Sequence, residues 1–181
     1  MKEQWGRNLV LIGFRCSGKS RVGLVVSQFL GMSLVDTDHL IELEAGCSIY
    51  ELVAREGWSE FRKIEKKVVS QVSHTTDQVI ATGGGVVLDQ ENVQSLKQRG
   101  VLVWLQASVA AIKERMLRQK DFMKTRPSLT GVDPLSEVEE LLREREPLYA
   151  RASDAVVVTE GLSINQVAFR VARVFIDKKG I

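Results

Sequence analysis

The residues from Gly13 to Ser20 combine glycine, lysine and serine in an order that suits phosphate binding. They read Gly-Phe-Arg-Cys-Ser-Gly-Lys-Ser and fit the pattern G-x-x-x-x-G-K-[ST]. The glycines let the backbone turn its N–H groups toward phosphate oxygens, and the N-terminus of a following helix adds its dipole. We expect Lys19 to bridge the β- and γ-phosphates of ATP and Ser20 to ligate Mg²⁺. The expected nucleotide-contacting residues of this segment are Gly13, Cys16, Ser17, Gly18, Lys19, Ser20 and Arg21.

The alternative for this loop is a chance glycine-rich turn. An apolar run over 9–13 predicts a buried strand before the loop, and the pattern over 19–30 predicts a helix after it. Because the mechanism requires a strand on one side and a helix on the other, the context favours the phosphate-binding interpretation.

Two carboxylates follow a second predicted strand, 33–36. They stand at Asp36 and Asp38, and side chains two residues apart on an extended chain point the same way. We therefore expect both at the C-terminal end of that strand, where ligands gather in open α/β sheets. Asp36 can hold Mg²⁺ through water while Asp38 orients a substrate hydroxyl. The alternative is that one aspartate only caps a helix that begins near His39.

Arg62 lies beside the apolar stripe of a predicted helix, and Glu65 falls inside that stripe three residues later. A carboxylate on the buried side that holds an arginine suggests a guanidinium prepared for a carboxylate or a phosphate. A purely structural ion pair fits these residues equally well. The stripe consists of Phe61, Ile64, Val68 and Val72.

Arg145 lies at the centre of an apolar helix face, with charged residues on the opposite side. A charge on a buried face needs a partner, which is either a ligand anion or an internal carboxylate. The pattern alone leaves both open. The apolar positions are Val138, Leu141, Leu142, Leu148 and Tyr149.

Three consecutive glycines, Gly83, Gly84 and Gly85, follow a third predicted strand at 79–82. Consecutive glycines cost backbone entropy, and they fit a place where a ligand touches the main chain. A plain flexible turn is the alternative.

A segment without periodicity, about 118–133, is rich in Lys, Arg, Thr and Gly. Its length favours a functional lid over a simple connection. Arg126 in this lid is a candidate to close over the γ-phosphate and stabilise the transition state. A solvated basic loop is the alternative. The next helix is expected to begin at Pro134, with Asp133 as its cap, or at a capping box formed by Ser136 and Glu139.

The remaining elements complete an α/β pattern. Strands separated by helices predict a parallel sheet covered on both faces, a three-layer α/β/α fold. The other expected elements are two or three helices within 40–73, helices over 91–99, 107–117 and 165–176, and strands over 101–105 and 155–159.

Composition narrows the class of protein. The 181 residues suit one domain, 1–181, and a net charge of +2 with 44% hydrophobic residues is typical of a globular protein rather than of a nucleic-acid binder. Two cysteines do not make a disulfide framework, and no apolar run is long enough to span a membrane. We expect a cytoplasmic monomer without nucleic-acid or membrane partners.

Together the motifs resemble those of the shikimate kinase family, in the family's order and over about residues 8–160. The motifs are the phosphate loop, Asp-Thr-Asp, Phe-Arg-x-x-Glu, Gly-Gly-Gly, Arg-Pro in the lid and Arg-x-x-Leu-Tyr. The resemblance implies a nucleoside-monophosphate-kinase-like fold of the P-loop class, with a five-stranded parallel sheet, a lid and a shikimate-binding region at about 37–65. It also implies ATP and Mg²⁺ as cofactors.

The resemblance further implies which residues bind each group. Asp38, Arg62, Gly84 and Arg145 would bind shikimate, with Gly83 and Gly85 beside them. Arg126 would contact the ATP phosphates, and Arg118 would stack near the adenine. The sequence departs from the family's usual pattern at Cys16, often Gly, and at Arg21, often Thr.

The nearest rival function is another kinase of the same fold, for gluconate or for a nucleoside monophosphate, since arginines grip phosphates as well as carboxylates. A rival of another class is a nucleotide-binding regulatory protein without catalysis. The intact Lys19, Ser20, Asp38 and Arg126 argue against it.

Overall fold

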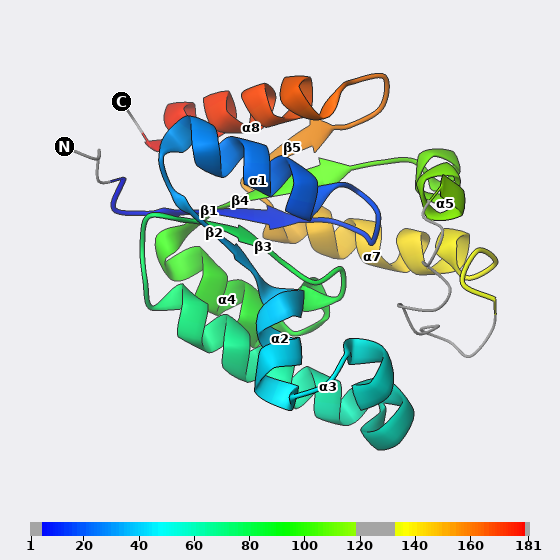
Figure 1. Ribbon diagram of the computed structural model, residues 1–181. Coiled ribbons are helices and arrows are strands. Elements are labelled where there is room, and N and C mark those ends of the chain that lie inside the picture. Colours follow the sequence, from blue (N-terminus) through cyan, green and yellow to red (C-terminus); the bar gives the residue numbers. More distant parts are fainter. Residues whose placement is uncertain (1–4, 119–132, 180–181) are drawn as a thin grey trace.

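Five parallel strands form one sheet in the order β2-β3-β1-β4-β5 (Figure 1). The computed structural model describes residues 5–118 and 133–179. The central strand β1 pairs with β3 on one side and β4 on the other, so that Leu9 is in register with both Val79 and Val101. The strands are β1 Asn8–Ile12, β2 Ser33–Asp36, β3 Gln78–Ala81, β4 Gly100–Gln106 and β5 Ala155–Val158.

Helices cover both faces of this sheet, with α1 and α8 on one face and α3, α4 and α7 on the other (Figure 1). The three layers and the five parallel strands confirm the expected fold. The helices are α1 Lys19–Leu30, α2 Thr37–Ala45, α3 Ile49–Ser73, α4 Gln90–Arg99, α5 Val109–Arg118, α7 Val138–Ala152 and α8 Ile164–Lys179, with a 3-10 turn η1 at Val86–Leu88.

The strand β1 shows how the sequence divides the core. All five of its residues are buried, and alternate side chains point to opposite faces. Leu9 and Leu11 pack with α1 and α8, whereas Val10 and Ile12 pack with α3, α4 and α7. A continuous apolar run is what a strand covered on both sides requires.

The starts of α4, α5 and α8 differ from the expected positions by one or two residues, and the starts of α2 and α7 differ in ways that bear on the site. α2 begins at Thr37, directly after the strand, so Asp38 lies in the first turn of a helix and not on an extended chain. The inference that Asp36 and Asp38 point the same way along one strand was therefore wrong. α7 begins at Val138, because Asp133 accepts hydrogen bonds from the amides of Leu135 and Ser136 and so closes a turn ahead of the helix.

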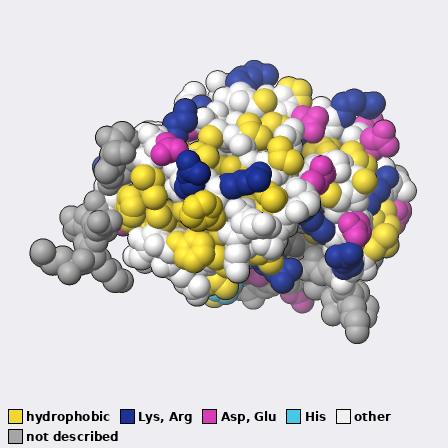
Figure 2. All heavy atoms as spheres, turned by 90° about the horizontal axis from the view of Figure 1, so that it is seen from above, with side chains coloured by type: hydrophobic (Ala, Val, Ile, Leu, Met, Phe, Trp, Pro, Cys, Tyr) yellow, Lys and Arg dark blue, Asp and Glu magenta, His cyan; other side chains and the backbone are white. Residues whose placement is uncertain are grey.

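The face over α1 and α8 mixes side chains of every kind. Figure 2 shows Lys and Arg interspersed there with Asp, Glu and hydrophobic groups. Phe29 of α1 and Phe169 of α8 are among the exposed hydrophobic residues. Within the described ranges, no helix is both long enough and apolar enough to cross a membrane.

Candidate functional site

The phosphate loop connects β1 to α1, as its motif requires. Gly13 has φ 143°, and a Cβ there would stand 2.6 Å from the carbonyl oxygen of Leu105, so both conformation and space require glycine. The Nζ of Lys19 donates to the carbonyl oxygens of Gly13 and Phe14, at 2.8 Å each. The lysine is buried by the loop that it closes, which holds its charge where a phosphate would enter.

Cys16 is the non-glycine residue of the phosphate loop that has a left-handed backbone, at φ 59°. A side chain costs roughly 1–2 kcal/mol in that region, and glycine avoids the cost but loses more entropy on folding. Cys16→Gly is therefore expected to raise the melting temperature slightly, by about 1–2 °C. Thermal unfolding measures this. The matched Cys47→Gly has no left-handed backbone to relieve and should not stabilise the protein; a lower melting temperature for Cys16→Gly would contradict the argument.

Ser20 and Asp36 meet at the C-terminal end of the sheet. The Oγ of Ser20 donates to Oδ2 of Asp36 at 2.5 Å, while Oδ1 of Asp36 accepts from the amide of Asp38 and caps α2. Asp36 is therefore the helix cap that the sequence offered as the alternative, and it also faces the phosphate loop through Ser20. Its contact with Mg²⁺ stays a prediction. A hydroxyl and a carboxylate side by side are the hard oxygen ligands that Mg²⁺ takes, so these residues fit that ion.

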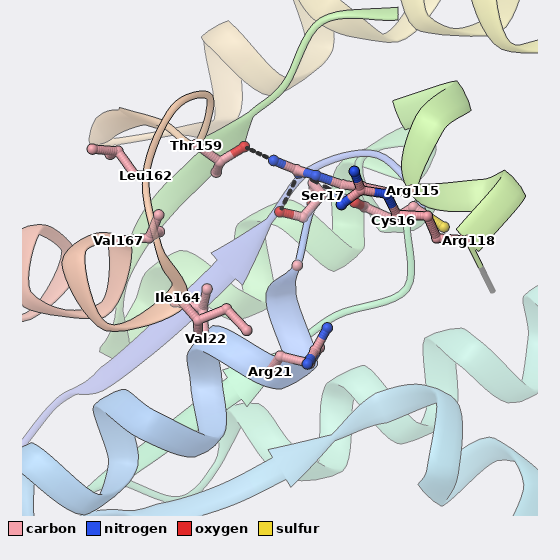
Figure 3. A pocket seen from close by; sticks show the side chains of 11 residues that line it. Cys16, Ser17, Arg21, Val22, Arg115, Arg118, Thr159, Leu162, Ile164 and Val167 are labelled. Carbon is pink, nitrogen blue, oxygen red and sulfur yellow. Dashed lines mark hydrogen bonds between the residues drawn. The ribbon is translucent and has the colours of Figure 1, made fainter. Parts of the chain in front are cut away.

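A cavity of about 490 Å³ opens beside the phosphate loop (Figure 3). Its polar side carries Arg21, Arg115 and Arg118, and its apolar wall comes from Leu162 and Ile164 beyond β5. An apolar wall facing guanidinium groups suits a flat aromatic base with phosphates attached. The cavity is therefore the candidate nucleotide site.

Arg115 is a cavity residue that the sequence reasoning missed. Its Nη1 donates to the carbonyl oxygens of Cys16 and Ser17 at 3.3 Å, and its Nη2 donates to Oγ1 of Thr159 at 3.0 Å (Figure 3). It thus links the phosphate loop to the end of β5. No pattern within a short stretch of sequence predicts a contact between residues that are 99 positions apart.

Of the two arginines expected to contact the nucleotide from the lid, Arg118 is among the described residues and Arg126 is not. Arg118 is the last residue of α5 and lines the cavity, where it pairs with Glu114 at 2.6 Å and stays largely exposed. Arg126 lies outside the described residues. Its contact with phosphate stays a prediction.

A second pocket lies on the other side of the phosphate loop. Asp38 at the start of α2, Arg62 of α3 and Arg145 of α7 all line it, together with the glycine triplet. The triplet is packed closely: a Cβ on Gly83 would stand 2.8 Å from Oδ1 of Asp38. Four motifs far apart in the sequence therefore meet in this second pocket, which we call the acceptor pocket.

Arg62 and Glu65 form the ion pair expected from their spacing. Nη1 of Arg62 lies 2.5 Å from Oε2 of Glu65, whose side chain is 1% exposed. Burial raises the pKa of Glu65, and the Arg62 guanidinium opposes that rise. Oε1 of Glu65 accepts no hydrogen bond within the described part of the chain. The pair therefore fixes one guanidinium at the pocket and leaves a buried acceptor beside it.

Arg145 is buried as the helix pattern predicted, at 6% exposure. Its Nη1 donates to the carbonyl oxygen of Gly84 at 3.5 Å, and its guanidinium lies 5.6 Å from the centre of the Phe14 ring. Tyr149 also donates to Gly84, and burial raises the pKa of its phenol. No carboxylate of the described residues lies within 4 Å of Arg145, so its charge is available to a ligand anion in the acceptor pocket.

Comparison with known proteins places this arrangement in a family. A family model described as shikimate kinase matches residues 15–175. A shikimate kinase of Caldanaerobacter subterraneus subsp. tengcongensis is 40% identical over 174 residues, covering 96% of this chain and 99% of the relative.

Solved structures give the same result. A shikimate kinase from Acinetobacter baumannii in complex with shikimate superposes with a TM-score of 0.88 at 30% identity, covering 97% of this chain and 96% of that one. A gluconokinase from Sinorhizobium meliloti 1021 shares only the fold, with a TM-score of 0.61 at 12% identity over 98% of this chain and 95% of that one. The chain belongs to the shikimate kinase family.

Proposed function

We propose that this chain transfers the γ-phosphate of ATP to the 3-hydroxyl of shikimate. The observation that carries the choice of acceptor is Arg145, a buried guanidinium without a carboxylate partner among the described residues, beside the Arg62–Glu65 pair. Two guanidiniums at one pocket suit the carboxylate of a small hydroxy acid. Family membership supports the same substrate.

On the donor side, the nucleotide occupies the cavity beside Arg115, and its phosphates lie along the loop. The Nζ of Lys19 lies over the loop, where it donates to two carbonyl oxygens. When the nucleotide binds, Lys19 gives up one of these hydrogen bonds and donates to the β- and γ-phosphate oxygens instead. Mg²⁺ held by Ser20, and through water by Asp36, supplies charge neutralisation at the phosphates when bound. Positioning and electrostatics do most of the catalysis.

On the acceptor side, Arg62 and Arg145 hold the carboxylate and Asp38 contacts the ring hydroxyls. The attacking hydroxyl oxygen forms its bond to the γ-phosphorus as the bond from that phosphorus to the bridging oxygen breaks. The hydroxyl proton passes to the carboxylate of Asp38. The glycine triplet keeps side chains out of the space between Asp38, Glu65 and Arg62, so the substrate lies against the main chain.

A panel of acceptors tests this function. ADP release in a coupled assay is measured with shikimate, gluconate, AMP and CMP. Turnover is expected with shikimate and at background with the other three. Turnover with AMP but not with shikimate would overturn the proposal, since the guanidiniums would then serve a phosphate.

Gly85 offers a test of the acceptor pocket itself. Its φ of −103° is open to any residue, but a Cβ there would stand 2.2 Å from Nη2 of Arg62. In Gly85→Ala the guanidinium must swing away, so the KM for shikimate is expected to rise about tenfold, as for the loss of one charged hydrogen bond. The KM for ATP should stay the same. Steady-state kinetics check both, and an unchanged KM for shikimate would remove Arg62 from substrate binding.

A further inference from the structure

A part-buried ion pair joins the phosphate loop to the residue directly before the helix that carries Arg145. Nη1 of Arg15 lies 3.3 Å from Oε1 of Glu137, and the two side chains are 13% and 2% exposed. The residues are 122 positions apart. Because desolvation offsets much of the attraction in a buried pair, such a pair is weak as a source of stability. Its placement therefore suggests a role in the site.

Arg15 belongs to the phosphate loop, yet it lines the acceptor pocket with Arg62 and Arg145. The loop backbone packs directly on the glycine triplet, since a Cβ on Gly84 would stand 3.0 Å from the amide nitrogen of Arg15. The nucleotide cavity begins one residue later, at Cys16. Arg15 thus stands at the boundary between the candidate nucleotide cavity and the acceptor pocket, which a phosphoryl group would cross in the proposed transfer.

Glu137 is placed to hold that guanidinium still. It is the residue directly before α7, and its carbonyl oxygen accepts the amide of Leu141 at 3.1 Å, so its backbone is fixed by the helix. The adjoining Phe14 also contacts α7, through the guanidinium of Arg145. Two consecutive loop residues are therefore docked on α7, and one helix sets the positions of two guanidiniums at the acceptor pocket.

We propose that Arg15 contacts the phosphoryl group as it crosses between the two pockets and that Glu137 is its positioning residue. The inference rests on the proposed phosphoryl transfer and adds a charge contact to it. Arg15 forms no covalent bond and takes no proton; its N–H groups face the equatorial oxygens, where charge is spread in the transition state. Because Glu137 holds the Arg15 guanidinium in place before the reaction, the guanidinium does not have to reorient during phosphoryl transfer.

The test compares Arg15→Met, Glu137→Gln and the double variant with the matched control Glu140→Gln, an exposed residue of the same helix. Arg15→Met is expected to lower kcat about 100-fold, as for the loss of one preorganised donor. Glu137→Gln should lower kcat about tenfold through misplacement, with Glu137→Asp partly restoring it. The KM values should change little. The double variant should be no slower than Arg15→Met, because the proposed role of Glu137 in catalysis is to position Arg15.

A second measurement separates this role from a structural one and keeps the inference testable if Arg15→Met unfolds through the loss of the ion pair with Glu137. Affinity for ADP is measured with shikimate, with and without aluminium fluoride as a mimic of the phosphoryl group. The double variant, which removes both charges of the ion pair, should bind ADP normally and lose the tightening that aluminium fluoride gives. Unchanged tightening, or kcat losses that multiply in the double variant, would overturn the inference. Failure of the unmodified protein to phosphorylate shikimate would instead refute the proposed function.

Discussion

Asp38→Asn is expected to lower kcat for shikimate about a thousandfold, the middle of the range for a positioned acid–base group. Asp38 lines the acceptor pocket, and its Oδ1 reaches toward the glycine triplet at Gly83. Asparagine keeps the shape of the side chain but accepts no proton from the attacking hydroxyl. Steady-state kinetics give kcat, and a fluorescence titration with ADP should show unchanged affinity, because the nucleotide cavity lies on the other side of the loop.

Asp89→Asn is the control for this substitution. Asp89 caps α4 by accepting the amide of Glu91, and asparagine caps a helix as well as aspartate does. Its kcat should match that of the unmodified protein. Asp38 itself stands in the first turn of α2, where losing a negative charge costs about 0.3–1 kcal/mol, so Asp38→Asn should remain folded. Unimpaired turnover in Asp38→Asn would exclude it as the base.

The elements of the fold were predictable because each rests on a local pattern. The helix over Lys19–Leu30 and the strand over Ser33–Asp36 match the expected ranges, and the other strands differ by one or two residues. The buried run of β1 and the loop after it carry their signals within a dozen residues. The pairing of Arg62 with Glu65 was equally local, being set by helical spacing.

The errors in the starts of α2 and α7 came from short carboxylate side chains, which can accept a hydrogen bond from any of several nearby backbone amides. Asp133 is of a residue type that often caps helices, yet it caps a separate turn at 134–136, ahead of the helix that begins at Val138. Asp36 ends its strand at once by accepting the amide of Asp38. That turned the expected extended segment into the first turn of a helix. Sequence does not tell which of several amides such a carboxylate will accept from.

The contacts that define the site most closely could not be predicted at all. Arg15 meets Glu137, and Arg115 meets Cys16, across long stretches of chain that only the folded sheet brings together. Both arginines look like ordinary exposed charges in the sequence, because neither lies on an apolar stripe as Arg145 does. Hence the apolar-stripe pattern identified the buried Arg145, but it gave no sign of Arg15 and Arg115 at the phosphate loop.

Replacing Arg145 with lysine is expected to raise the KM for shikimate about 10- to 100-fold, which corresponds to the 1.5–3 kcal/mol of a charged hydrogen bond. Lysine keeps the positive charge, but a point charge cannot reproduce the two parallel hydrogen bonds of the guanidinium fork. Arg145 is 6% exposed and lies beside Gly84, so water has little access to replace its hydrogen bonds. Steady-state kinetics measure the change. Arg143→Lys, exposed on the opposite side of α7, is the control and should leave KM unaltered.

The alternative role of Arg145, a purely structural one, predicts a different pair of results. Its contacts with Gly84 and with the ring of Phe14 connect α7 to the glycine triplet and to the phosphate loop. If those contacts were its purpose, lysine would lower the melting temperature and leave the KM for shikimate as it was. If the guanidinium instead holds the substrate carboxylate, KM rises, and excess shikimate raises the melting temperature of Arg145→Lys much less than that of the unmodified protein, because a ligand stabilises only in proportion to its affinity. Thermal unfolding with and without shikimate therefore decides between the two roles.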